Sequence, residues 1–249
     1  NIGLVPNKEM IDIRVSHGMV LGPDNQKMSK SKGNVINPDD IVKEYGADTL
    51  RTYEMFMGDY QQDAPWSTDS LRGCKRFLDK VERLASKVNE KDGYSEQLKV
   101  IQNKTIKSID DDLGRMSYNT YISSLMILAN AYDDLDSITK EDYRLLLILL
   151  NPVAPHMTEE LNEQLGYDAI CYAKWPVYDE AYLVEKEKEI AVQVNGKVRA
   201  TIVISTDDSE EVIKEKAMKA ENVVRHIEGC QIVKVIVIKG KIVNIVVKK

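Results

Sequence analysis

The chain has 249 residues, enough for two or three domains, and its 43% of hydrophobic residues is an ordinary share for a soluble protein that buries hydrophobic cores. No stretch of about 18 apolar residues occurs and no basic start leads into an apolar run, so neither a transmembrane helix nor a secretory signal is predicted. The net charge of −6 is uneven, with +4 on residues 186–249 (13 Lys and Arg against 9 Asp and Glu) and −10 on the rest.

The first forty residues combine strand and turn signals with one charged loop. One or two strands are predicted in residues 10–22, from a short alternation (Ile11, Ile13, Val15) and an apolar triplet (Met19, Val20, Leu21). A Gly-Pro-Asp-Asn turn at residues 22–25 leads into a lysine- and serine-rich loop at residues 26–34. Asn37 followed by Pro38 and two acidic residues predicts the start of a helix, with Asn37 as its cap.

Residues 67–166 carry apolar side chains at spacings of three and four, which predicts amphipathic helices. Pro152 and Pro155 end the fourth of five such stretches, and Gly166 is placed to cap the fifth. Because each helix has to bury its stripe against the others, a helix bundle is expected. The stripes begin at Leu71, Leu98, Ile122, Tyr143 and Thr158.

The pattern changes to a period of two after a connector at residues 167–188. Alternating runs flank Asn195-Gly196, which predicts a hairpin because both turn residues need a positive φ. Two helical stretches follow, and a second hairpin is expected around residues 239–241. The order ββααββ predicts a small α/β domain.

The cysteines are too far apart to form a Cys-x-x-Cys pair. Their spacing predicts no disulfide framework and no zinc or other metal site, and it fits a reducing cytoplasm. The three residues are Cys74, Cys171 and Cys230.

The loop at residues 26–34 is the segment most suggestive of chemistry. It alternates three lysines with small hydroxyl residues and ends in Gly33-Asn34. Two ammonium groups on such a loop can neutralise charge that grows on phosphate oxygens during displacement at an α-phosphate. Gly22 and Gly33 on either side would let the loop swing shut and exclude water. Composition alone leaves a solvated charged loop as the alternative.

Residues 27–31 read KMSKS, which resembles the signature loop of class I aminoacyl-tRNA synthetases. The wider string, GMVLGPDNQKMSKSKGNVINPDDIVKEYGADTLRTYEMFMG, resembles the bacterial leucyl family best, although isoleucyl, valyl and methionyl enzymes share KMSKSxGN. The resemblance continues through NPVAPH at residues 151–156 to VQVNGKVRATI and KVIVIKGKIVNIVVK near the end. It covers nearly the whole chain, with one departure at Asn162, where the family usually has Trp.

The resemblance implies an α+β multidomain fold in three parts. Residues 1–62 would be an α/β stump that ends the catalytic domain and carries the KMSKS loop. Residues 63–185 would be a helical bundle of the anticodon-binding type. Residues 186–249 would be a small C-terminal α/β domain that binds tRNA.

The resemblance also implies a function, the ligation of leucine to tRNA(Leu) with ATP and Mg²⁺ as substrates. Such an enzyme is expected in the cytoplasm as a monomer, away from membranes and without a structurally bound cofactor. Lys30 corresponds to the ATP-contacting lysine and Lys27 assists it, so these two are the predicted catalytic residues. Met28 is expected to anchor the loop. The predicted ATP-binding set is Lys27, Met28, Ser29, Lys30 and Ser31.

The family's HIGH motif, leucine pocket and editing domain are expected to lie N-terminal to residue 1. The chain alone is therefore predicted not to catalyse aminoacylation. None of the three histidines sits in a HIGH-like string. His17 and His226 are expected on the surface, and His156 is expected to cap or pack at a helix start.

Two alternatives stay open at this point. The chain could be a tRNA-binding module with no catalytic loop function, or the equivalent part of an isoleucyl, valyl or methionyl enzyme. A basic end on an acidic body indicates a polyanion contact, although each lysine there is also consistent with simple solvation. The predicted tRNA-binding residues are Lys197, Arg199, Lys234, Lys239, Lys241, Lys248 and Lys249.

Overall fold

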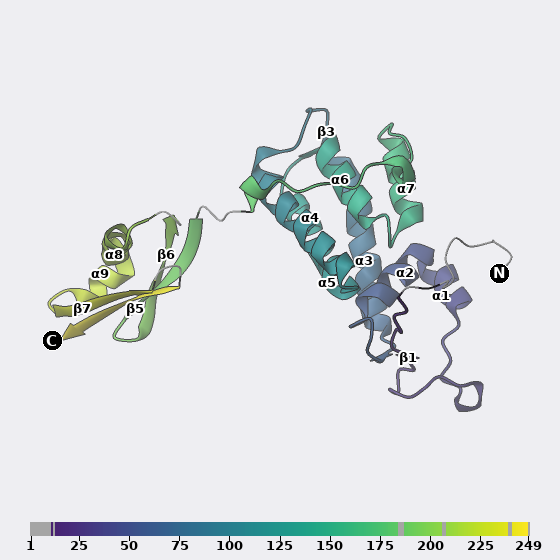
Figure 1. Cartoon of the computed structure of the whole chain (residues 1–249), viewed down its shortest axis with the longest axis horizontal. Helices are drawn as coiled ribbons and strands as arrows, with labels where there is room; N and C mark the ends of the chain where they lie inside the picture. Colours follow the sequence, from purple (N-terminus) through teal and green to yellow (C-terminus); the bar gives the residue numbers. More distant parts are fainter. Residues whose placement is uncertain (1–10, 12, 184–186, 206–207, 239–240, 249) are drawn as a thin grey trace. The chain divides into compact units, whose positions relative to one another are not determined.

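The computed structural model describes residues 11, 13–183, 187–205, 208–238 and 241–248. The chain divides into two compact units, Asn1–Glu180 and Ala181–Lys249 (Figure 1). None of the helices in the described ranges has the length and apolarity needed to cross a membrane. The three-part division expected from the sequence stays a prediction.

The first unit consists mainly of helices. Two short parallel strand pairs accompany them, β1 (Val20–Leu21) with β2 (Ala64–Pro65) and β3 (Val88–Asn89) with β4 (Ile138–Thr139). The helices are α1 (Pro38–Tyr45), α2 (Ala47–Phe56), α3 (Thr68–Leu84), α4 (Lys99–Gly114), α5 (Tyr118–Asp133), α6 (Lys140–Leu150) and α7 (Pro155–Gln164).

The five predicted bundle helices are confirmed as α3 to α7. Their apolar stripes meet in one core that includes Val81, Ile109, Leu125 and Leu146, all fully buried. The cap at Asn37 is also confirmed, because its side chain accepts a hydrogen bond from the backbone N–H of Asp39. Gly166 follows α7 by two residues with a φ of 85°, in the left-handed conformation that ends helices.

The strand expected from the alternation near residue 11 is not formed as predicted. Within residues 10–22 one of the predicted strands forms, at Val20–Leu21, while the described residues from 11 to 19 adopt no regular structure. Ile11 and Ile13 are 63% and 81% exposed. A period of two produces a strand only where a neighbouring strand supplies hydrogen bonds, and β1 pairs with just two residues of β2.

The connector after α7 is fixed along the bundle rather than free. The Nε1 of Trp175 donates to Asp110 Oδ1 at 2.7 Å, and the backbone N–H of Asp179 donates to Asn103 Oδ1 at 2.6 Å. Both acceptors belong to α4, so the connector runs along this helix to the end of the first unit.

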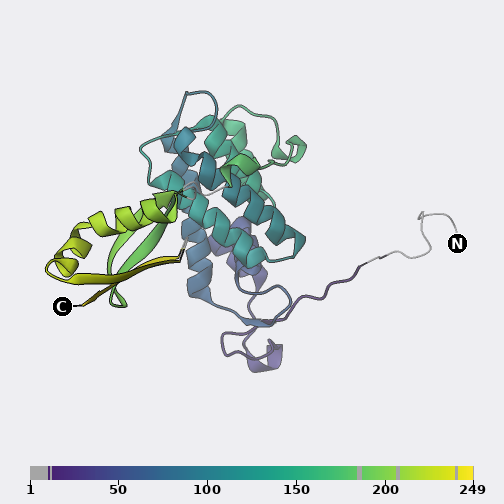
Figure 2. The ribbon, with the colours of Figure 1, turned by 60° about the vertical axis from the view of Figure 1, so that its left-hand side comes forward.

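The second unit has the predicted ββααββ order. It comprises β5 (Glu187–Val194), β6 (Lys197–Ser205), α8 (Glu210–Lys219), α9 (Glu221–Ile227), β7 (Gln231–Ile238) and β8 (Ile242–Lys248). The sheet order is β6-β5-β8-β7, in which the central pair β5 and β8 is parallel. Both helices lie along one face of this sheet (Figure 2), where Val192, Ile213, Val223 and Val243 are fully buried.

The predicted Asn195-Gly196 turn is confirmed, with φ values of 50° and 78°. Two positive φ values in succession match the right-handed twist of a hairpin, which explains this residue pair. The second predicted turn includes residues 239–240, which lie outside the described residues.

Candidate functional site

The lysine loop, defined here as residues 26–34, begins at an antiparallel bridge between Leu21 and Lys27. The turn inside this bridge is closed by a backbone hydrogen bond from Gly22 N to Gln26 O at 2.8 Å. In both views of the ribbon the loop extends away from the helices (Figures 1 and 2). The bridge and the closed turn thus form the base from which the loop projects.

The side chain of Asn34 ties the two ends of the loop together. Its Oδ1 accepts from the backbone N–H of Ser29 at 2.9 Å, and its Nδ2 donates to Asp24 Oδ1 at 3.1 Å. The hydrogen bond from Asn34 is the largest cause that lowers the pKa of Asp24. Asp24 therefore stays ionised, and remains an acceptor, at neutral pH.

The middle of the loop is a single 3-10 turn, Lys30–Lys32. Ser29 caps this turn, because its Oγ accepts from the backbone N–H of Lys32 at 3.3 Å. Gly33 ends the turn with a φ of 65°, a conformation that glycine adopts at little cost. The Oγ atoms of Ser29 and Ser31 lie 3.2 Å apart and form a hydrogen bond with each other.

The three lysines of the loop differ in their partners. The Nζ of Lys32 donates to Gln26 Oε1 at 2.6 Å. Lys27 and Lys30 are exposed, and among the described residues no hydrogen bond or ion pair engages either ammonium group. The structure thus separates the two lysines predicted to be catalytic from the third, which is held inside the loop.

Met28 holds the loop to the fold, in agreement with its expected role as an anchor. It is half-buried and packs against the apolar cluster that contains Leu50 and Tyr53 of α2, Trp66 and Leu71. The rings of Tyr53 and Trp66 meet edge to face at 4.8 Å. Because Met28 stands between the two outward lysines, its burial fixes where they emerge.

Gly22 packs closely against the two side chains that close the loop. A Cβ at this position would lie 2.7 Å from Asp24 Oδ1 and 2.9 Å from Asn34 Nδ2. Any larger residue would therefore displace the pair that closes the loop. The hinge function expected for Gly22 remains untested, and its close contacts supply a sufficient reason for the glycine.

In the second unit, Lys234 and Lys248 share the face of the sheet that the helices leave open. Their neighbours Val235 and Val247 pack against the core under α8 and α9. Because successive side chains of a strand point to opposite faces, the two lysines point away from that core. Both are exposed.

Lys197 lies at the same end of the sheet but on the other face. It pairs with Val194, which is buried in the core, and directly opposed residues share a face. Lys197 and Lys248 are near each other along the strands, because Asn195, two residues before Lys197, forms two hydrogen bonds with the backbone of Val247, the residue before Lys248. These bonds measure 2.9 and 3.1 Å.

The remaining predicted tRNA-binding residues do not join this group as one patch. Arg199 is the extra residue of a β-bulge, half-buried, with an Nε that has no hydrogen-bond partner among the described residues. Lys241 lies beside Ile242, at the opposite end of the sheet. Lys239 and Lys249 lie outside the described residues.

The cations on the helices of the second unit are paired, whereas Lys234 and Lys248 form no ion pair within the described ranges. Each lies within 4 Å of an acidic side chain, mostly one helical turn away. The pairs are Lys214–Glu210, Lys216–Asp208, Lys219–Glu215 and Arg225–Glu221.

Sequence reasoning missed Asp24 and Asn34 as members of the site. The signal was present in the Gly-Asn that ends the KMSKSxGN string, but the string does not reveal that Asn34 folds back onto residues five and ten positions earlier. An Asp in a Gly-Pro-Asp-Asn sequence is also explained by the turn itself, so Asp24 gave no separate signal of a contact with the loop.

The histidines, Asn162 and Cys74 were also considered from the sequence, and the structure places each of them. His17 and His226 are exposed, as expected, and His156 stands in the first turn of α7. Asn162 is fully buried and its Nδ2 donates to Asp168 O at 2.9 Å. Burial raises the pKa of the Cys74 thiol to about 12, which leaves it protonated and unreactive.

Two family models match the chain. The model described as the anticodon-binding domain of tRNA ligase matches residues 101–214. The model described as tRNA synthetases class I (I, L, M and V) matches residues 3–67, which include the lysine loop.

One curated relative and one solved structure extend these matches to almost the whole chain. A leucine–tRNA ligase from Alkaliphilus oremlandii is 47% identical over 247 residues, which are 99% of this chain and 31% of the relative. The crystal structure of a LeuRS–tRNA–LeuAMS ternary complex from Agrobacterium radiobacter matches with a TM-score of 0.72 and 26% identity, covering 94% of this chain and 33% of that chain. The chain thus spans about a third of the length of the relatives that it matches.

Proposed function

The chain belongs to the leucine–tRNA ligase family of class I tRNA synthetases, and we propose that within such an enzyme it closes the ATP site and binds tRNA. The reaction would join the leucine carboxylate to the α-phosphate of ATP with release of pyrophosphate, and then transfer leucine to tRNA(Leu). The lysine loop would act in the first step, and the bundle and the C-terminal sheet would hold the tRNA.

The observation that carries the proposal is the pair of unengaged ammonium groups on an anchored loop. Lys27 and Lys30 flank the half-buried Met28 and have no partner in the described part of the chain. Negative charge grows on the phosphate oxygens as pyrophosphate leaves, and preorganised cations lower the energy of that state. Lys32, bound to Gln26, has no such role in this proposal.

Mg²⁺ would reach the site as part of the ATP complex. No cluster of three or more His, Cys, Asp or Glu side chains suited to a metal ion occurs among the residues that the structure describes. Mg²⁺ usually keeps several waters and takes most of its other ligands from substrate phosphates. The lysines would then contact phosphate oxygens that the metal leaves open.

The C-terminal sheet would contact the tRNA backbone rather than its bases. Residues 186–249 contain no Phe, Tyr or Trp on which a base could stack. Lys234 and Lys248 are exposed on the helix-free face, and lysine recognises phosphate as a point charge. The solved relative is itself a complex with tRNA.

Leucine is favoured as the amino acid because of the curated relative. The class I model covers isoleucyl, leucyl, methionyl and valyl enzymes alike, so it does not separate them. The relative at 47% identity over 99% of the chain is a leucine–tRNA ligase. We propose further that the enzyme acts as a cytoplasmic monomer, and that this third of it does not catalyse aminoacylation alone.

Substitution of the loop lysines in the full-length enzyme tests the first step. Lys30→Ala should lower the rate of leucine-dependent ATP–pyrophosphate exchange about 100-fold, the usual effect of removing one donor to a developing charge. Lys32→Ala is the matched control, because it removes the same charge from the same turn, and it should change the rate less than threefold. Equal effects of the two substitutions would contradict the proposal.

Salt dependence tests the tRNA contacts. Lys234→Ala and Lys248→Ala should each weaken tRNA binding and reduce the slope of log K against log salt concentration by about 1. Lys219→Ala on α8 is the control, since that lysine is already paired with Glu215. If the control changes the slope as much as the sheet variants, a general charge effect replaces a specific contact.

A further inference from the structure

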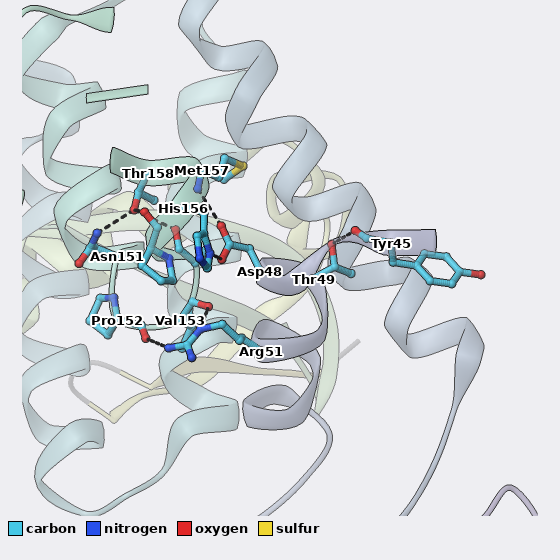
Figure 3. Close-up of polar contacts among 12 residues, drawn as sticks. Tyr45, Asp48, Thr49, Arg51, Asn151, Pro152, Val153, His156, Met157 and Thr158 are labelled. Atoms are coloured by element: carbon cyan, nitrogen blue, oxygen red, sulfur yellow. Dashed lines mark hydrogen bonds and ion pairs between the residues drawn. The ribbon is translucent and has the colours of Figure 1, made fainter. Parts of the chain in front are cut away.

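Helix α2 engages both ends of the turn between α6 and α7. Asp48 and Arg51 lie three residues apart on this helix and point to the same side (Figure 3). Asp48 meets the beginning of α7, and Arg51 meets the residues that follow α6. No feature of the sequence indicated this contact, since its members are more than 100 residues apart.

Asp48 supplies the cap that α7 lacks. The N-cap residue of α7 is Ala154, whose side chain cannot accept a hydrogen bond. Asp48 Oδ2 accepts from the backbone N–H of Met157 at 2.7 Å, and Oδ1 accepts from His156 Nδ1 at 2.7 Å. A carboxylate at the positive end of a helix dipole is stabilised there, and Asp48 is only 8% exposed.

Arg51 satisfies the carbonyl groups at the other end of the turn. Its Nη2 donates to Pro152 O at 3.0 Å and its Nε donates to Val153 O at 3.2 Å. These carbonyls follow the last residue of α6, where free oxygens and the negative end of the helix dipole attract a cation. The guanidinium fork holds two neighbouring carbonyls at once, which fixes an orientation as well as a distance.

The same helix carries the anchor of the lysine loop. Leu50 and Tyr53 of α2 belong to the cluster against which Met28 packs. The hydroxyl of Tyr53 also accepts from the backbone N–H of Ser67 at 2.6 Å, at the start of α3. Residues 48–53 of α2 thus connect the α6–α7 turn of the bundle with the base of the loop.

We propose that Asp48 and Arg51 are positioning residues for the transfer of leucine to tRNA, because they hold the bundle in a fixed place relative to the helix that anchors the lysine loop. This inference rests on the proposed function. A tRNA held by the bundle would then present its acceptor end in a constant position, and small displacements far from the reacting atoms lower rates strongly. Loss of the contact would spare tRNA binding and the tRNA-independent ATP step.

The test uses the full-length enzyme with Asp48→Ala and Arg51→Lys. Both should lower the single-turnover rate of leucine transfer to tRNA about tenfold. The tRNA dissociation constant and the ATP–pyrophosphate exchange rate without tRNA should stay within twofold of the parent. Arg51→Lys keeps the charge on an exposed side chain but loses the fork, so it reports even where Asp48→Ala fails to fold. Asp48→Asn, which keeps an acceptor for Met157 N–H, should restore most of the transfer rate.

Asp142→Ala is the matched control for a purely structural effect. Asp142 is also buried and also accepts from backbone N–H groups at a helix start, but its partners Thr139 and Ser95 lie within the bundle and not on α2. It should lower the melting temperature while leaving the transfer rate within twofold of the parent. The proposal is overturned if this control slows transfer as much as the α2 variants. It is also overturned if transfer and ATP exchange fall in parallel in those variants. The proposed function fails by a different result. If Lys30→Ala leaves ATP–pyrophosphate exchange unchanged, the role of the lysine loop is contradicted, whatever the α2 variants do.

Discussion

The lysine loop and the helical bundle each contain one polar side chain that bonds to several segments, and the two side chains differ in burial. In the loop, half-buried Asn34 bonds to the backbone of Ser29 and to the exposed carboxylate of Asp24. In the bundle, Asp142 has no exposed surface. The bonds of Asn34 are exposed or part-buried, whereas those of Asp142 are part-buried or fully buried, so water competes more for the first network than for the second.

Asp142 connects three separate segments of the bundle. Its Oδ2 accepts from Thr139 N at 3.0 Å in the capping box of α6, and its Oδ1 accepts from Ser95 N at 3.1 Å. The Nε2 of Gln102 donates to the same Oδ1 at 2.6 Å. Buried networks of this kind are costly to break, whereas exposed ones mainly fix a shape. The comparison therefore predicts stability effects in the bundle and activity effects in the loop.

The largest expected effect is on stability, from Asp142→Ala. The substitution takes the acceptor from four buried or part-buried donors, the N–H and hydroxyl of Ser95, the Gln102 Nε2 and the N–H of Thr139, and it removes half of a capping box. We expect a loss of about 3 kcal/mol, equivalent to about 9 °C in the melting temperature of the first unit. Thermal unfolding followed by far-UV circular dichroism measures it. A loss below 1 kcal/mol would remove the distinction between the two networks.

The reverse result is expected for Asn34→Ala. Its partners gain water when the amide is removed, so the melting temperature should change by less than about 2 °C. The loop loses its closure, and we expect ATP–pyrophosphate exchange by the full-length enzyme to fall about tenfold. Asn34→Asp, which keeps the acceptor for Ser29 N–H but repels Asp24, should be intermediate. If Asn34→Ala lowers the melting temperature and leaves the exchange rate unchanged, the Asn34 network serves stability and this prediction is contradicted.

Asn195 in the C-terminal hairpin offers a third network between these extremes. Its amide bonds twice to the backbone of Val247, but the residue is exposed. Asn195→Ala loses both bonds and places Ala at a φ of 50°, so we expect a loss of about 1 kcal/mol in the unfolding of the second unit. Asn195→Gly separates the two causes, because it removes the bonds and relieves the backbone. Urea denaturation provides the measurement.

The smallest effect is expected from a surface ion pair of the bundle. The hydrogen bond from Lys87 lowers the pKa of Asp133, whose carboxylate lies 3.0 Å from the Lys87 Nζ. The resulting stability is present above the ordinary Asp pKa and is lost as the pH falls through the lowered value. Because both side chains keep partial contact with water, we expect Lys87→Met to cost about 0.5 kcal/mol at pH 7. The part of the difference that comes from the ion pair should disappear below the lowered pKa, and the part that remains belongs to the hydrogen bonds from Lys87 Nζ to the carbonyls of Asp133 and Leu135. A difference that does not change with pH would contradict the contribution of the ion pair.

Local patterns were sufficient to predict most of the elements. The spacing of apolar residues placed α3 to α7, and Asn195-Gly196 placed a hairpin whose turn residues both have positive φ. The lysine loop was recognised because its composition and order are contiguous in the chain. The alternation near Ile11 failed as a prediction because a strand also depends on a partner that the pattern does not contain.

The sequence by itself determined where helices and hairpins form, because helix and turn signals act over a few residues. Only the tertiary structure decided which charges are engaged. Lys32 has a partner while Lys27 and Lys30 have none in the described part of the chain, and Asp48 meets a helix that begins 107 positions later. Such pairings depend on how the core brings distant segments together, and a charge in a sequence carries no record of its neighbour in space.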